Sequence, residues 1–212
     1  MKDLIALHNG PLVFKSCSFD DEDLSRLDMR GFQFQQCTFS ATAWNAADLE
    51  ASIWIKCRGS LADFSSAQLQ DAQFQGCDVN NSKWQRASLS STSFQDCKLT
   101  GACFVHSSGL GLSFEDCLLV GADLRGLSFR KVHLKQLDFS EADLSGCDFR
   151  EATFNGGSLR QAHIKLAQFQ KADLRATDIS GLQVLDAGFF QDAVISSQQA
   201  ADLLGALGLT VA

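Results

Sequence analysis

The sequence predicts an all-β protein whose chain winds into a square coil with four five-residue sides. The first observation is a large apolar residue at every fifth position from Phe14 to Val194, in one phase. Of the 37 positions in this series, 35 carry Phe, Leu, Trp, Met, Ile or Val, and the exceptions are Gly59 and Gly109. The second observation is a cysteine at every twentieth position over much of the chain, and the third is a change of pattern after residue 195.

A period of five residues excludes the ordinary regular elements. Five residues turn an α-helix by about 500°, so the apolar positions would spread around the helix and form no stripe. In a straight strand an odd period alternates between the two faces and cannot line one core. The period fits a chain that turns a corner every five residues, because four such corners close one coil.

The cysteines support the coil independently. They recur once per expected coil, at Cys17, Cys37, Cys57, Cys77, Cys97 and Cys117. In such a coil they lie above one another on one side, about 4.8 Å apart. They belong to a second series, two residues before the large positions, in which 27 of 36 residues are small. We expect reduced thiols buried as small hydrophobic groups. The alternative, a metal or redox ladder, requires exposed thiolates.

The predicted elements follow in order along the chain. Residues 1–11 are expected to cap the exposed edge of the first coil. Residues 12–195 are expected to form one uninterrupted β-helix domain. Residues 196–212 begin with a helix capped by Ser196 or Ser197, which Gly208 ends, and an apolar tail follows. At Gly59 and Gly109 we expect either a locally thinner core or a place where the coil flexes or admits a partner.

Short segments in the second half of the chain suggest a family. Residues 122–126 (ADLRG), 142–146 (ADLSG) and 172–176 (ADLRA) share the form A-D-L-x-x. They resemble the units of pentapeptide-repeat proteins, and the resemblance extends over about residues 12–195. It implies a right-handed quadrilateral parallel β-helix with a C-terminal capping helix. The hand of the coil rests on the resemblance alone, since the period does not determine it.

The C-terminal end narrows the resemblance to the Qnr, MfpA and albicidin-resistance group of this family. Gln199-Ala200, Leu203, Leu207-Gly208-Leu209 and Val211 are similar to the end of the Qnr quinolone-resistance proteins. Residues 200–204 (AADLL) are similar to the end of the albicidin-resistance protein. The resemblance implies a homodimer joined through this end. The implied interface residues are Leu203, Leu204, Leu207, Leu209 and Val211, and the same side chains can plug the last coil.

The resemblance also implies a function. Members of this group mimic duplex DNA and bind the type II topoisomerases DNA gyrase and topoisomerase IV. They protect the enzyme from quinolones or a natural gyrase toxin, or they inhibit it. Qnr proteins of the Gram-negative type carry loops that interrupt the five-residue phase, whereas this sequence shows no interruption between residues 14 and 194. It resembles loop-free MfpA in that respect, which favours inhibition. The alternative function is a generic interaction rod, a scaffold or effector with another partner.

Charge gives a candidate contact surface. The formal net charge is −7, so a DNA mimic of this kind reproduces only part of the charge of a duplex. A two-fold dimer joined at the C-terminal end would place the second half of the chain against a two-fold topoisomerase. The candidate contacts there are Asp138, Asp143, Asp148, Glu151, Asp173 and Asp178. Most of them directly precede a large apolar residue, where Asp can instead bond backbone N–H groups at the corners.

Catalytic and metal sites are not expected. The four histidines are scattered without ligand spacing, and no phosphate-binding or dinucleotide glycine motif occurs. A tube filled by Phe and Leu leaves no pocket for a small substrate. We therefore expect no enzyme, no cofactor and no metal. The apolar run of residues 4–7 is too short for a signal peptide or a membrane span. We expect a cytoplasmic protein with neither a nucleic acid nor a membrane as partner.

Overall fold

The computed structural model describes residues 10–183, 187–206 and 208. The chain forms two compact units, residues 1–118 and residues 119–212, and each is described by itself. The expected cap at residues 1–11 lies almost entirely outside the described residues. Within the described residues, no helix is both long enough and apolar enough to cross a bilayer.

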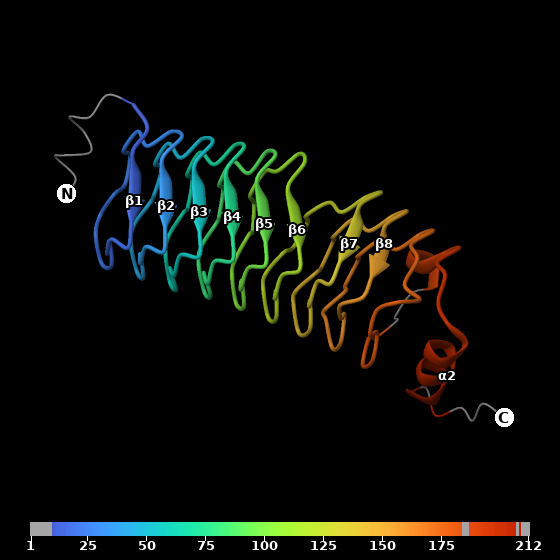
Figure 1. Ribbon diagram of the computed structural model, residues 1–212. Helices are drawn as coiled ribbons and strands as arrows, with labels where there is room; N and C mark the ends of the chain where they lie inside the picture. The colour runs from blue at the N-terminus through green and yellow to red at the C-terminus, as the bar shows by residue number, and fades with distance from the viewer. Residues whose placement is uncertain (1–9, 184–186, 207, 209–212) are drawn as a thin grey trace. The chain divides into compact units, whose positions relative to one another are not determined.

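Each unit is a parallel β-helix of stacked coils (Figure 1), and its strands and isolated bridges mark four sides in each coil. The strands of the first unit are β1 (Val13–Lys15), β2 (Gln33–Gln35), β3 (Ile53–Ile55), β4 (Gln73–Gln75), β5 (Ser93–Gln95) and β6 (Ser113–Glu115). Consecutive strands pair in parallel, in a register that places Phe14 opposite Phe34. The second unit contains β7 (His133–Lys135) and β8 (Thr153–Asn155), paired in the same way. The predicted fold, a right-handed quadrilateral β-helix, is confirmed.

The other three sides of each coil carry isolated bridges instead of named strands. Ser18 bridges to Thr38 and Asp23 to Ala43, so these sides keep the register of the strands. The second unit ends with the short 3₁₀ helix η1 (Ala187–Phe190) and the α-helix α2 (Ser197–Ala206). The predicted C-terminal helix is therefore present.

Corners of the coil explain the five-residue period. The second residue after each large apolar position adopts a left-handed backbone conformation at most corners, as Ala41 does with φ 53°. One residue later, the Thr42 N–H donates to the Phe39 carbonyl over 3.3 Å and closes a tight turn. Among the described residues, 25 that are not glycine have positive φ. Each costs about 1–3 kcal/mol, so the packing between coils has to outweigh a large local strain.

The large apolar series fills the core as predicted. Equivalent rings of successive coils stack face to face, with centroids 5.3 Å apart for Trp54 and Phe74 and 4.9 Å apart for Phe74 and Phe94. These rings are almost fully buried, and so are the small residues of the second series such as Ala72. The stacking adds to the burial energy because offset aromatic pairs attract one another.

Gly59 and Gly109 are explained by neighbouring side chains. A side chain at Gly59 would overlap the ring of Phe39 in the preceding coil. At Gly109, a Cβ atom would lie 2.9 Å from the Cβ of Leu112, a large residue at a position where small ones predominate. Neither glycine marks a thinner core, because in both places a neighbour occupies the space.

The predicted phase is wrong in the last coil. In earlier coils the N–H of a central residue donates to a carbonyl of the next coil. The acceptor is the residue just before the equivalent central residue, as when the Phe149 N–H donates to the Gln168 carbonyl. By this rule Phe169 should donate to Gly188, but it donates to the Phe189 carbonyl over 2.7 Å. Its ring stacks on Phe190 with a centroid distance of 4.8 Å. The chain has thus gained one residue, and Phe190 takes the inward position that the sequence assigned to Phe189.

Two further features show the same shift. The left-handed corner residue of this turn is Asp192, one residue later than the period requires, and the Ala193 N–H closes the turn on the Phe190 carbonyl. Val194, the last predicted core residue, is 44% exposed. The turn at residues 179–182 is still in phase, since Gly181 has positive φ and the Leu182 N–H donates to Ile179. The extra residue therefore lies between Leu182 and Phe189.

Five of the six spaced cysteines are buried in the first unit, and Cys17 in the first coil is partly exposed. The thiols donate to carbonyls of the preceding coil, as Cys77 does to Trp54 over 3.4 Å. Burial raises the pKa of Cys37, and it raises the pKa of Cys147, in the second unit, to about 12. Hydrogen bonds with the thiols of Cys57 and Cys97, together with burial, raise the pKa of Cys77. The redox ladder requires thiolates that solvent can reach, and the burial of these thiols opposes it.

The shifted phase can be tested with two neighbouring phenylalanines. We expect Phe190→Ala to lower the free energy of unfolding by about 2–3 kcal/mol and Phe189→Ala by less than about 1 kcal/mol, because only Phe190 continues the ring stack. Phe94→Ala, in the middle of the first unit, is the positive control with about 3–5 kcal/mol. Urea denaturation followed by circular dichroism measures all three. If Phe189→Ala lowered the free energy of unfolding more than Phe190→Ala does, the predicted unbroken five-residue phase would be right.

Thiol labelling tests the buried ladder. At pH 8 a small maleimide should label Cys17 and Cys103 in the native protein, since these two side chains are partly exposed. The other six thiols should react only after unfolding, because the reaction requires a thiolate that solvent can reach. Mass spectrometry of peptides after timed labelling gives the rate at each site. Native labelling of Cys77 or Cys97 at the rate of Cys17 would contradict the buried ladder.

Candidate functional site

Aspartates that precede a large apolar residue bind the backbone of their own turn. The Asp63 carboxylate accepts the Ser65 N–H over 2.9 Å, and Asp138 and Asp178 accept the N–H groups of Ser140 and Ser180 over 3.0 and 2.9 Å. The sequence offered this structural explanation for the aspartates, and the geometry supports it. The same carboxylates still reach the surface, so the hydrogen bond to the turn leaves their negative charge available there.

Arginine two residues after such an aspartate neutralises it. Arg150 forms two hydrogen bonds of 2.8 and 2.7 Å with Asp148, and Arg175 forms two of 2.9 and 2.6 Å with Asp173. The bond from Arg150 lowers the pKa of Asp148, although burial opposes the shift. These pairs reduce the negative field over the surface around them.

The six candidate topoisomerase contacts do not form one face of the second unit. Asp138 and Asp178 share one side of the coil, Asp143 lies on the next side, and Asp148 and Glu151 lie on the third. Asp173 lies on the side of the named strands, where it bridges to Thr153. The coil therefore spreads these carboxylates over all four sides.

Four of the six candidates also lie next to a cation. Asp148 and Asp173 have the arginines described above, and Asp143 lies 3.5 Å from Arg125. Glu151 lies 3.3 Å from Arg130 and 3.6 Å from Lys131. In the part of the chain that the structure describes, Asp138 and Asp178 have no ion pair.

The charge of the chain is uneven between the two units. Residues 1–118 contain 14 acidic and 9 basic residues, whereas residues 119–212 contain 11 acidic and 9 basic residues. The first unit is therefore the more acidic one, although the candidate contacts were chosen in the second. Counting charges along the sequence could have found this difference, because it needs no structure.

Helix α2 is fixed to the end of the coil by Gln199. The Ser196 hydroxyl accepts the Gln199 N–H over 3.2 Å, and the Gln199 side-chain oxygen accepts the Ser196 N–H over 2.7 Å. This is a capping box, and it confirms the predicted cap at Ser196. The amide Nε2 of Gln199 donates to the carbonyls of Leu174 and Thr177 over 2.8 and 2.7 Å. The sequence did not reveal this second role.

The predicted dimer residues are only partly described. Leu203 is half-buried and lines a cleft of about 240 Å³ between α2 and residues 177–182. Leu204 is 39% exposed. Leu207, Leu209 and Val211 lie outside the described residues. The described end of the second unit thus leaves apolar surface beside an incompletely covered coil.

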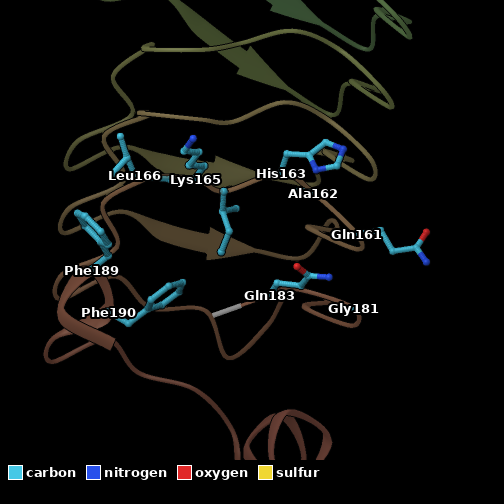
Figure 2. A pocket seen from close by; sticks show the side chains of 11 residues that line it. Gln161, Ala162, His163, Lys165, Leu166, Gly181, Gln183, Phe189 and Phe190 are labelled. Carbon is cyan, nitrogen blue, oxygen red and sulfur yellow. The ribbon is translucent and has the colours of Figure 1, made fainter. Parts of the chain in front are cut away.

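A larger cleft of about 630 Å³ lies where the phase shifts (Figure 2). One wall is formed by residues 161–167 and the other by Gly181, Gln183, Phe189 and Phe190. Polar side chains such as His163 and Lys165 line it together with the two aromatic rings. This cleft was not predicted from the sequence, in which the adjacent pair Phe189-Phe190 was the one available signal.

Metal chemistry finds no support among the described residues, which contain no group of three or more His, Cys, Asp or Glu side chains that could hold an ion. The surface offers hydrogen-bonding and charged groups on a regular lattice, with strands about 4.8 Å apart. Such a surface suits the binding of another macromolecule.

Comparison with known proteins gives the family. The family model described as "Pentapeptide repeat region" matches residues 27–104 and 112–189. A trypsin-treated variant of QnrB1, a plasmid-mediated fluoroquinolone resistance protein, has a similar structure with a TM-score of 0.80 and 22% sequence identity. That match covers 96% of this chain and 100% of the QnrB1 chain. Full-length QnrB1 matches with a TM-score of 0.66 and 20% identity, over 93% of this chain and 100% of that one.

The comparison with curated proteins gave no match. At identities of 20–22%, the likeness to QnrB1 establishes the fold and does not by itself carry the activity. The family model covers well over half of the chain, in two blocks that together span most of both β-helical units. The chain therefore belongs to the pentapeptide-repeat family.

Proposed function

We propose that this protein is a Qnr-like DNA mimic that binds a type II topoisomerase, DNA gyrase or topoisomerase IV, in the cytoplasm. The single observation that carries the proposal is the likeness in fold to QnrB1 over nearly the whole of both chains. The protein acts by binding and not by catalysis, because its core is filled with stacked rings and its polar groups face outward. The bound enzyme is either protected from quinolones or a natural toxin, or inhibited.

Inhibition is the outcome that the chain favours. The five-residue phase is interrupted by one residue between Leu182 and Phe189, and the turns before it follow the period. No long loop leaves the coil in residues 10–183, so the contacts of this stretch come from its flat sides and corners. A smooth acidic surface can occupy a DNA-binding site, but it has no projecting loop with which to reach a drug site.

The proposed contact surface remains the set Asp138, Asp143, Asp148, Glu151, Asp173 and Asp178. Within it we rank Asp138 and Asp178 first, since they lie on one side of the coil and have no ion pair among the described residues. The other four are partly neutralised by arginine or lysine. Exposed charges contribute little individually and are screened by salt, so the effect has to be sought in combined variants.

A homodimer through the C-terminal end is part of the proposal. The last coil presents the N–H groups of Ile179 and Gly181 at its edge, and within the described residues neither donates a hydrogen bond. Unpaired donors at a sheet edge favour pairing with a second chain. Leu203 and Leu204 supply apolar surface next to that edge.

The second candidate function is a generic interaction rod with another partner. It is favoured by the nearly balanced charge of residues 119–212, which a mimic of DNA does not require. A supercoiling assay with purified gyrase, with and without a quinolone, separates the two. Loss of supercoiling without drug, or its recovery in the presence of drug, supports the topoisomerase partner, whereas no effect of a large molar excess in either condition favours the generic rod.

The charge contribution can be separated from the fold by substitution with asparagine. Asp138→Asn combined with Asp178→Asn should weaken binding to gyrase about three- to ten-fold at low salt and flatten its salt dependence. Asparagine keeps the side-chain oxygen that accepts the Ser140 and Ser180 N–H groups, so the melting temperature should stay within a degree or two. Binding isotherms at two salt concentrations measure the effect.

Matched variants control this experiment. The pair Asp21→Asn and Asp23→Asn, near the other end of the chain, removes the same charge and should change binding less than two-fold. Asp138→Ala with Asp178→Ala removes the charge and the turn bond together, and should also lower the melting temperature. Equal losses from the two asparagine pairs, or none from either, would remove the DNA-mimic mechanism.

The dimer is tested with Leu203→Glu. We expect this variant to be monomeric, because it places an unpaired carboxylate in an apolar contact. Multi-angle light scattering gives the mass, and circular dichroism shows whether the coil is intact. The exposed Leu61→Glu in the first unit is the control and should leave the mass unchanged. A dimeric Leu203→Glu protein with an unchanged spectrum would place the interface elsewhere.

A further inference from the structure

One corner of the first unit carries a polar trough that the proposed function does not use. It has a volume of about 460 Å³ and is open to solvent. Its lining residues come from the first four coils and are polar or small: Asp23, Ser25, Arg26, Asn45, Ala46, Ser65, Ser66 and Arg86. The trough therefore runs across successive coils and not along one of them.

The trough exists because two arginines enclose two small residues. Arg26, Ala46, Ser66 and Arg86 occupy the same left-handed corner in four consecutive coils. Ala46 and Ser66 are short, so the corner is hollow between the long side chains at its ends. With coils about 4.8 Å apart, the two arginine corners are separated by about 14 Å.

Both arginines keep their charge available. Within the described residues, neither Arg26 nor Arg86 forms an ion pair, and both side chains are exposed. Arg30, close to Arg26 in the sequence, contacts Asp28 over 2.6 Å and is neutralised. Arg26 and Arg86 stand at the two ends of the trough, whose lining also contains Asp23, level with Arg26.

The row of residues beside the trough carries two aspartates, Asp23 level with Arg26 and Asp63 level with Ser66, and it ends with Lys83 level with Arg86. Asp23, Ala43, Asp63 and Lys83 bridge in that order along the row. The Asp63 carboxylate accepts the Ser65 N–H, and hydrogen bonds from Ser65 and Asn45 lower its pKa although burial opposes the shift. Asp63 therefore stays ionised at neutral pH. Because Asp63 lies between the two arginine corners, the trough favours a ligand that carries its negative groups at the arginines and an uncharged stretch between them.

We propose that this trough binds an extended acidic peptide segment with two carboxylates four residues apart. An extended chain rises about 3.3 Å per residue, so four residues span about 13 Å, which matches the separation of the arginine corners. Arginine binds carboxylates with two parallel hydrogen bonds, which fixes the register. The hydroxyl group of Ser66 lies between the ends and offers a hydrogen bond to the backbone of the peptide.

Charge spacing disfavours a strand of nucleic acid as the ligand. A strand of duplex DNA carries one charge about every 3.4 Å along the axis, so about four charges would lie over a stretch of about 14 Å. Those between the two arginine corners would pass Asp63 and be repelled. A peptide avoids this because Ser or Gly can stand between its two acidic residues.

Fluorescence anisotropy with a labelled synthetic peptide tests the proposal on the full-length protein. The probe has two glutamates four positions apart, with serine and glycine between them. We expect saturable binding that Arg26→Gln with Arg86→Gln weakens at least ten-fold. Gln36, Gln136 and Gln161 already occupy left-handed corners of this protein, so glutamine at these two corners should leave the melting curve unchanged.

Matched probes and variants decide between outcomes. Arg58→Gln with Arg160→Gln removes the same charge outside the trough and should leave affinity within two-fold. A peptide with its glutamates two positions apart should bind at least five-fold more weakly. Equal binding of both peptides, tighter binding of tripolyphosphate or a DNA oligonucleotide, or equal losses from both arginine pairs would overturn the proposal. None of these readouts involves a topoisomerase, so the result is independent of the proposed function.

Discussion

The backbone ladder between coils is the constraint on which the rest of this structure depends. A central residue donates its N–H to a carbonyl of the next coil, as Phe149 does to Gln168, and each following coil repeats the bond. The repeat fixes the height of each coil, which places equivalent side chains about 4.8 Å apart. Ring stacks, the thiol ladder and the surface rows all follow from that distance. The left-handed corners are tolerated because neighbouring coils within a unit share their core and their ladder.

The fold was predictable because its period is unlike that of any other regular structure. The inward series, the small series and the cysteine spacing each require the same coil, and all three are patterns of side-chain size along the sequence. The phase shift was not predictable from size alone. Phe189 and Phe190 are both large and apolar, so either one satisfies the period, and only the ladder bond from Phe169 decides between them. The reason for a glycine at position 59 was equally unpredictable from the period, because the ring that excludes a larger side chain there belongs to Phe39, one coil earlier.

The candidate surface was less predictable than the core. Sequence spacing could have shown the Asp-x-Arg pairs, because residues two apart on one strand point the same way. It could not show that Glu151 lies between Arg130 and Lys131, since that contact joins different coils. Nor could it show that the Gln199 side chain replaces the backbone donor that the missing next coil would have supplied to Thr177. Such contacts depend on where one coil ends and the next begins.

Core and surface of this fold are set by different residues. The aspartate at a turn needs only its side-chain oxygen to hold the next N–H, so its charge is available for another use. An arginine two residues later cancels that charge, as at Asp148 and Asp173, while a serine leaves it in place, as at Asp138 and Asp178. One outward position per turn therefore sets the local field without disturbing the core. The corner residue sets the shape of the surface, since the short side chains of Ala46 and Ser66 leave a trough that longer side chains would fill. The charge and shape of the surface thus depend on outward residues that the five-residue period leaves free to vary, and under the proposed function these residues would set which partner binds.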